Sequence, residues 1–137
     1  MRAHGVVADT HAIVWYLDSP VDLSAAATNA LDNAANDETQ RIYISAISLI
    51  EMQYLTEKGK IKPVVLPKVL AEIDDPQPII EVIPIDRTVS DHLAVIPRDT
   101  VTDMPDRIIA ATALMLNLSL ITVDTSIRSL TNVVTVW

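Results

Sequence analysis

Cysteine is absent from this chain of 137 residues, and glycine occurs only at Gly5 and Gly59. The lack of cysteine excludes disulfide bonds, thiolate zinc sites and cysteine nucleophiles. Charged residues make up only 20% of the chain, whereas half of the residues are hydrophobic. This composition argues against disorder and predicts a compact globule. Because the chain is long enough for one core and too short for two, we expect a single domain over residues 1–137.

Long apolar runs are missing as well. The longest run without a charge, residues 108–123, contains Asn117 and Ser119 and is shorter than the roughly 20 residues that a membrane helix needs. Near the N-terminus, Asp9 interrupts the apolar stretch too early for a signal peptide. We therefore expect no membrane span, and cytoplasmic residence is the default expectation.

Positive charge is in short supply, since the formal net charge is -8. Such a balance ordinarily argues against a nucleic-acid partner, because phosphate contacts need Lys and Arg. The sign misleads if acidic side chains hold metal: two divalent ions add four positive charges and leave a net charge of -4. Acidic surface elsewhere would then suit a basic protein partner.

Helix and strand signals alternate along the chain. Ser24 is suited to cap a helix N-terminus, and Gly59 is suited to end a helix in the left-handed conformation. Five of the eight prolines lie between residues 60 and 84, which predicts a loop-rich segment there. The expected strands are 6–9, 41–44, 80–83, 118–123 and 133–136. The expected helices are 10–17, 25–35, one from Ser45 or Ser48 to about 58, 68–73, 88–95, 106–117 and 126–130.

This alternation predicts an α/β fold. Strands that are apolar throughout and separated by helices are typical of a parallel sheet covered on both faces. Such sheets bind their ligands at the carboxyl ends of the strands. Asp9 and Asp124 lie at two of these ends, so the pattern directs attention to this edge of the sheet.

Four acidic residues stand at separate joints of the chain: Asp9, Glu51, Asp106 and Asp124. Three of them border segments that are expected to be buried, where a carboxylate is costly unless it is paired or bound to a cation. Oxygen ligands suit hard cations such as Mg²⁺ or Mn²⁺. The four acids together therefore suggest a divalent-metal pocket.

Each acid also has a structural interpretation when it is considered alone. Glu51 faces the apolar stripe of its helix, where Lys58 could pair with it. Asp106 and Asp103 could both serve the first turn of a helix, and for Asp103 capping is the better interpretation. Asp9 and Asp124 each precede a Thr, which is typical of a helix start. Taken singly, each acid is more often structural than catalytic.

Taken together, four segments resemble the signature blocks of PIN-domain ribonucleases, particularly VapC-type toxins. They occur in the family's order, and the likeness extends over nearly the whole chain. A Lys-Gly-Lys-Ile stretch at 58–61 also resembles a family feature. One departure is that Thr102 precedes Asp103-Met104-Pro105-Asp106-Arg107, where many relatives place a His before Asp-Pro-Phe-Asp-Arg. The four segments are Val7-Ala8-Asp9-Thr10-His11-Ala12-Ile13-Val14-Trp15, Ser45-Ala46-Ile47-Ser48-Leu49-Ile50-Glu51, residues 103–113 and Leu120-Ile121-Thr122-Val123-Asp124.

The resemblance implies a three-layer α/β/α fold with a central, mostly parallel five-stranded sheet. It implies an endoribonuclease that uses Mg²⁺ or Mn²⁺ to hydrolyse RNA phosphodiester bonds. Asp9, Glu51 and Asp106 would be the main metal ligands, directly or through water, and Asp124 a further or second-site ligand. A small antitoxin would hold the enzyme inactive, and the chain would form a homodimer.

Other residues have supporting roles in this interpretation. Thr10 and Thr122 are candidates to orient a ligand or a water molecule. Arg107 is a candidate for RNA phosphate or for a salt bridge to a neighbouring acid, and a structural role is favoured for His11 over that of a general base.

The partner surface is expected on the helix that carries Glu51. Leu49 and Met52 project away from the Glu51 side of that helix, so they are expected to leave apolar surface for an antitoxin. An Arg or Lys of the antitoxin would then insert near the carboxylates.

Three alternative functions fit the sequence less well. A receiver domain needs adjacent acids after the first strand and a Lys after the fifth, and both are lacking here. A haloacid-dehalogenase-type phosphatase needs a second Asp where His11 stands. A PIN scaffold retained only for protein binding ranks low, because none of the four acids is lost.

Overall fold

The computed structural model describes residues 3–137 and contains a five-stranded sheet. All strand pairs are parallel, and the strand order is β3-β2-β1-β4-β5. The predicted α/β fold with a central parallel sheet is thereby confirmed. The strands are β1 (Gly5–Ala8), β2 (Arg41–Ser45), β3 (Ile80–Ile83), β4 (Leu120–Ile121) and β5 (Thr135–Val136).

Alternation along the strands sends apolar side chains to both faces of this sheet. Val7 of β1 pairs with Tyr43 and Leu120 on the neighbouring strands, and all three belong to one buried cluster. Ala8 pairs with Ile121, and both belong to a second buried cluster on the opposite face. Each face therefore needs its own cover of helices, which makes the fold three-layered.

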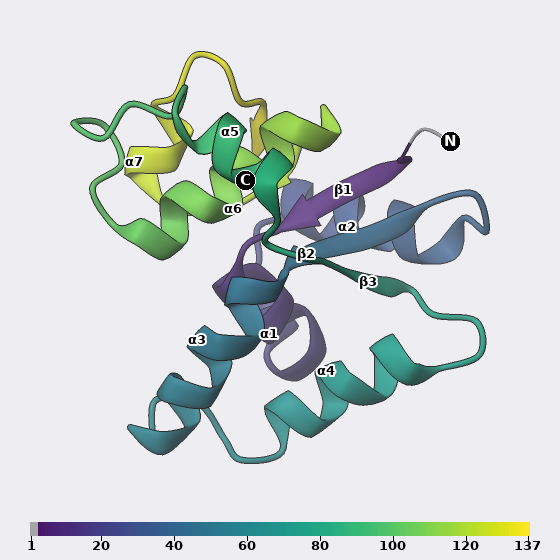
Figure 1. The fold of residues 1–137 in the computed structure, drawn as a ribbon. Helices are drawn as coiled ribbons and strands as arrows, with labels where there is room; N and C mark the ends of the chain where they lie inside the picture. Colours follow the sequence, from purple (N-terminus) through teal and green to yellow (C-terminus); the bar gives the residue numbers. More distant parts are fainter. Residues whose placement is uncertain (1–2) are drawn as a thin grey trace.

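Helices α5 (Arg87–Leu93), α6 (Met104–Leu116) and α7 (Thr125–Arg128) contribute to the cluster that contains Val7. Helices α1 (Thr10–Asp18), α2 (Ala25–Asn36) and α4 (Val65–Asp74) contribute to the cluster that contains Ala8. A short 3-10 turn, Pro20–Asp22, links α1 to α2. Figure 1 shows α5, α6 and α7 grouped apart from α1, α3 and α4.

Helix α3 (Ala46–Glu57) follows β2 directly and serves both clusters. Ile47 belongs to the cluster of α6, whereas Met52 is fully buried in the cluster of α1 and α4. The prediction that Leu49 and Met52 leave free apolar surface is therefore wrong. Leu49 is partly buried against the same core as Met52, to which α1 and α4 contribute.

Several element boundaries differ from the predicted ones. Helix α4 begins at Val65, because Pro67 falls in the first turn, where its missing N–H group is not needed. Helix α6 begins at Met104 for the same reason, with Pro105 in its first turn. Strands β4 and β5 are shorter than predicted, since only two residues of each pair with one another.

Other predicted boundaries agree closely with the structure. Ser24 caps α2 and Ser45 caps α3 through side-chain oxygens that accept backbone N–H groups. Gly59 follows α3 in the left-handed conformation, as expected. Within residues 3–137, no helix combines the length and the apolar character needed to cross a bilayer.

Gly5 supports a testable prediction about the sheet. Its φ is +135°, and a Cβ atom there would lie 1.9 Å from the carbonyl oxygen of Arg41 on β2. We expect Gly5→Ala to lower the free energy of unfolding by about 3 kcal/mol, from backbone strain plus steric clash.

Gly59→Ala is the matched control, because φ is also positive at +69° but no atom lies within 4 Å of the added Cβ. We expect a loss of about 1 kcal/mol there. Urea denaturation measures both values. Equal losses at the two glycines would contradict the close approach of β1 and β2.

Candidate acidic site

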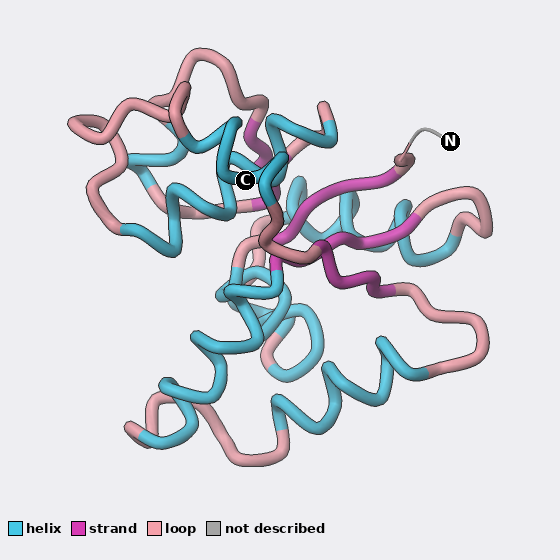
Figure 2. Tube along the Cα trace, viewed as in Figure 1, coloured by secondary structure: helices cyan, strands magenta, loops and turns pink. Residues whose placement is uncertain are grey.

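The four acids come together at the carboxyl end of the sheet. Asp9 follows β1, and Asp124 lies beyond β4, the neighbour of β1. Glu51 lies on α3, which starts directly after β2, and Asp106 lies in the first turn of α6. Figures 1 and 2 show that the starts of α1 and α3 meet where β1 and β2 end.

Asp9 is buried, with only 7% of its surface exposed, and both carboxylate oxygens accept hydrogen bonds. The backbone N–H of Ala12 donates to Oδ1 over 2.8 Å, so that Asp9 caps α1. The hydroxyl of Thr122 donates to Oδ2. Burial raises the pKa of the Asp9 carboxyl, although these two hydrogen bonds oppose the shift. Asp9 is therefore held rigidly in a dry setting.

Thr122 joins two of the acids. Its Oγ1 donates to Asp9 and accepts the backbone N–H of Asp124 over 3.1 Å. The side chain of Thr122 is fully buried, so water cannot replace it in this role. The end of β4 thus fixes Asp9 and Asp124 relative to one another.

Glu51 is half-buried and is oriented by Thr10. Thr10 Oγ1 lies 2.6 Å from Glu51 Oε1 and 2.9 Å from Ser48 Oγ. A hydroxyl has one proton, which goes to the carboxylate, so Ser48 donates to Thr10. Burial raises the pKa of the Glu51 carboxyl; the Thr10 hydrogen bond opposes this, and the charges of Asp103 and Asp9 reinforce it.

Asp124 differs from the other acids because its carboxylate is well supplied with donors. Ser126 Oγ donates over 2.5 Å and the N–H of Ile127 over 3.0 Å, which makes Asp124 the cap of α7. Burial raises the pKa of this carboxyl, but these hydrogen bonds outweigh burial and lower it overall. Asp124 therefore stays ionised.

Asp106 is the acid with the least support. It is half-buried, and no hydrogen bond reaches its carboxylate from the described residues 3–137. Burial and the charges of Asp103, Asp124, Glu51 and Asp9 raise its pKa from 3.8 to about 7. Asp103 itself is exposed and caps α6 by accepting the N–H of Asp106 over 3.1 Å, which is the role favoured for it from the sequence.

No basic side chain within residues 3–137 forms an ion pair with any of the four acids. Among these described residues, Lys58, which the sequence suggested as a partner of Glu51, forms no ion pair with it. Interaction with exposed His11 opposes the raised pKa values of Asp9 and Glu51, but the effect of burial on both carboxyls is larger. The site therefore carries negative charge that the described chain does not balance.

The donor set fits a hard divalent cation, because it consists of carboxylate and hydroxyl oxygens. Across residues 3–137, however, no three His, Asp or Glu side chains form a ready-made metal cage. This arrangement suits Mg²⁺, which usually keeps several waters and binds one or two carboxylates together with substrate phosphates. The residues thus fit an ion held partly through water rather than one in a closed cage.

Arg107 contacts backbone carbonyl groups that the sequence did not suggest, and its contact with RNA phosphate stays a prediction. Its Nη2 donates to the carbonyl oxygens of Leu93 and Ile96, over 3.1 and 3.0 Å. Its Nε is buried without a hydrogen-bond partner among the described residues. Arg107 therefore ties α6 to the end of α5, with no salt bridge to a neighbouring acid recorded between residues 3 and 137.

Ser48 is a supporting residue that the sequence analysis considered only as a helix start. It is fully buried, three residues before Glu51, and it holds the Thr10 hydroxyl that orients Glu51. The sequence did contain a signal for this role, because side chains three residues apart on a helix share a face. Ser48 is a polar residue on the same helix face as Glu51, so its position suggests a contact near Glu51.

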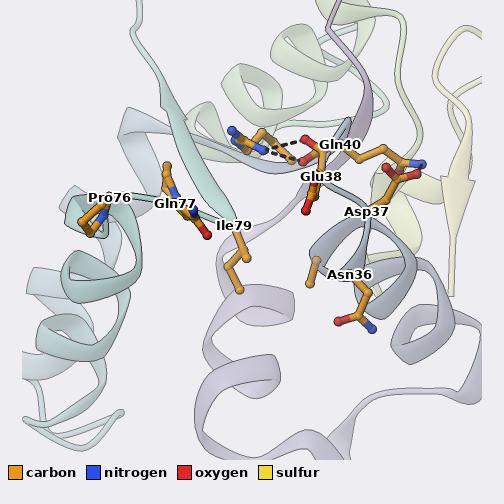
Figure 3. A pocket seen from close by; sticks show the side chains of 10 residues that line it. Asn36, Asp37, Glu38, Gln40, Pro76, Gln77 and Ile79 are labelled. Atoms are coloured by element: carbon orange, nitrogen blue, oxygen red, sulfur yellow. Dashed lines mark hydrogen bonds between the residues drawn. The ribbon is translucent and has the colours of Figure 1, made fainter.

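A cavity of about 430 Å³ lies at the opposite, amino end of β2 and β3 (Figure 3). Its polar groups are already engaged with one another: Gln40 Nε2 donates to Asp37, and Arg41 Nη1 donates to the carbonyl of Gln40. The four acids do not line this cavity.

Comparison with known proteins agrees with this geometry. The PIN-domain family model matches residues 6–132. Ribonuclease VapC22 of Mycobacterium tuberculosis is 31% identical over 134 residues, which cover 96% of this chain and 98% of that protein.

Solved structures share the fold at about 20% identity. One is VapBC2 from Rickettsia felis bound to a DNA fragment from the VapBC2 promoter. It has a TM-score of 0.69, and the match covers 95% of this chain and 96% of the Rickettsia chain. A toxin-antitoxin complex from Klebsiella pneumoniae has a TM-score of 0.65, with 96% and 97% covered. Since the family model spans most of the sequence and a curated relative aligns with nearly all of it, this chain belongs to the PIN-domain family.

Proposed function

We propose that this protein is a divalent-metal-dependent endoribonuclease and the toxin of a toxin-antitoxin pair. The observation that carries the proposal is the convergence of four acids from four separate segments, without a balancing basic side chain among residues 3–137. The names of similar proteins support it, since the curated relative is a ribonuclease and the structural neighbours include a toxin-antitoxin complex. Membership of the PIN-domain family argues against the two alternatives from other families, a receiver domain and a haloacid-dehalogenase-type phosphatase.

When bound, Mg²⁺ or Mn²⁺ would supply Lewis-acid chemistry that activates water and offsets negative charge in the transition state. The chain contributes position. Asp9 is held by Thr122 and Ala12, Glu51 by Thr10, and Asp124 by the N-terminus of α7. Asp106, with no hydrogen bond recorded to its carboxylate among residues 3–137, is available to bind a cation directly or through water.

The antitoxin partner is proposed for the outer face of α3. Ile50 and Tyr54 are 48% and 60% exposed, and they lie four residues apart on one face of that helix. They replace Leu49 and Met52 as the candidate contacts. A partner on this face would be close enough to insert a basic side chain toward Glu51, which lies on the same helix.

The metal-dependent site predicts the effect of Asp9→Asn. Asparagine keeps an oxygen that can cap α1, but its amide group replaces the oxygen that accepts from Thr122, and one negative charge is lost. We expect Mg²⁺- or Mn²⁺-dependent cleavage of structured RNAs to fall by about a hundredfold or more. Asp91→Asn is the control, because Asp91 is an exposed partner of Arg87 outside the acidic site. Cleavage that is equal in wild type and Asp9→Asn would contradict the assigned site.

The raised pKa of Asp106 predicts a pH effect on stability in EDTA. The unfolded carboxyl titrates near 3.8 and the folded one near 7, so the folded state holds a proton that the unfolded state has lost. Stability from this group therefore falls as the pH rises from about 4 to 7, and it stays low above pH 7.

We expect Asp106→Asn to stabilise the metal-free protein by about 1 kcal/mol at pH 8, a value reduced for solvent screening at this half-exposed group. Thermal unfolding at pH 5 and pH 8 measures the difference, with Asp91→Asn as control. Excess Mg²⁺ should stabilise the wild type more than the variant. A variant that is less stable than wild type in EDTA at pH 8 would argue against crowded carboxylates.

The partner surface is tested by co-purification with the product of the adjacent reading frame. The double variant Ile50→Asp, Tyr54→Asp should lose the complex, because two charges would enter an apolar contact. Val134→Asp is the control, since Val134 is 69% exposed and lies next to β5. Light scattering on the chain alone tests the predicted homodimer. Retention of the complex by the double variant would rule out this face.

A further inference from the structure

All four lysines of the protein lie between residues 58 and 68, at Lys58, Lys60, Lys62 and Lys68. No Asp or Glu lies within that stretch. The rest of the chain contains six arginines and 18 acidic residues, so its formal net charge is -12, whereas the net charge of residues 58–68 is +4. This short segment therefore has a net positive charge, whereas the rest of the chain has a net negative charge.

The structure places this lysine segment at the connection between α3 and α4 and in the first turn of α4. In Figure 1, that connection lies at the far end of α3 from the sheet. Lys62 and Lys68 approach Asp18 at 3.9 and 3.6 Å, yet their side chains stay 74% and 47% exposed. Within residues 3–137, Lys58 and Lys60 are exposed and form no ion pair.

Backbone hydrogen bonds hold Lys58 and Lys60 in place. The N–H of Lys58 donates to Tyr54, and the N–H of Lys60 donates to Leu55 over 2.8 Å. Gly59 between them adopts the left-handed conformation that closes α3. The two ammonium groups therefore project from a fixed turn rather than from a freely moving loop.

Helix α3 connects these lysines to the acidic site. Lys58 lies seven positions after Glu51, which corresponds to about 10 Å along a helix axis. The axial rise along one strand of a B-form duplex is about 3.4 Å per nucleotide, so this distance corresponds to about three nucleotides of a stacked strand. A strand with its reacting phosphate at the carboxylates is thus long enough to reach the lysines.

We propose that Lys58 and Lys60 bind the phosphate backbone of the RNA substrate a few nucleotides from the cleaved bond. This inference rests on the proposed function and deepens it. Ammonium groups bind phosphates as point charges, independently of the base sequence. Because the rest of the surface is acidic, this segment supplies much of the attraction that holds an RNA chain against the protein.

The test measures binding of a fluorescein-labelled single-stranded RNA by anisotropy, in the Asp9→Asn background with Mg²⁺ present. Adding Lys58→Gln and Lys60→Gln should weaken binding about tenfold at low salt. The slope of log affinity against log salt should become shallower by about 1.4, since two phosphate contacts of a single strand are lost. Arg87→Gln with Arg98→Gln is the control, because it removes equal charge from exposed positions elsewhere.

The same lysine substitutions are then measured for cleavage in an otherwise wild-type chain, where KM should rise and kcat should stay unchanged. RNA binding and a salt slope that match the arginine control would overturn the proposal, while metal-dependent cleavage would leave the proposed function standing. Lysine-dependent binding without cleavage by wild type would support this surface and refute the nuclease. If the double lysine variant loses antitoxin binding but keeps RNA binding, the proposal is overturned, and the lysines instead bind an acidic segment of the antitoxin.

Discussion

Repulsion among carboxylates at one end of the sheet is the constraint on which this structure depends. Two unit charges about 4 Å apart interact by about 4 kcal/mol at an effective dielectric near 20, so a cluster of acids needs protons or a cation. Asp106 shows the effect most clearly, because burial and four neighbouring acids raise its pKa to about 7. The fold tolerates this cost at the carboxyl ends of β1 and β4, where such sheets bind their ligands.

The fold holds most of these acids in place by giving each one a second, structural task. Asp9, Asp103 and Asp124 cap α1, α6 and α7, so helix N-termini offset part of their charge. Thr10, the first residue of α1, and Thr122, just after β4, add hydroxyl donors. The helices therefore start where they do for the same reason that the acids are fixed. An acid can therefore cap a helix and also take part in the proposed metal site.

Much of the fold could be predicted from the sequence. The strands at 41–44 and 80–83 agree with β2 and β3 to within one residue, because their apolar runs have clear ends. Strand β4 was predicted too long, since its length depends on pairing with β1 and β5 rather than on its own residues. Helix α4 starts three residues before the predicted start at residue 68, because Pro67 is harmless in a first turn.

The candidate site was predictable as a set of residue types but not as a set of contacts. The order of the acidic segments suggested Asp9, Glu51, Asp106 and Asp124, and their roles as metal ligands stay a prediction. The bond from Thr122 to Asp9 joins residues 113 positions apart, so only the folded sheet could show it. The partners of Arg107 were missed because backbone carbonyls at the end of α5 leave no mark in a sequence.

The most direct test of a shared cation is anomalous diffraction from a crystal of the protein grown with Mn²⁺. The account predicts a manganese peak at the carboxyl end of the sheet, contacted directly or through water by Asp9 and by at least one acid from another segment. Density for an arginine or lysine of the same chain between those carboxylates, or manganese bound only elsewhere, would contradict it.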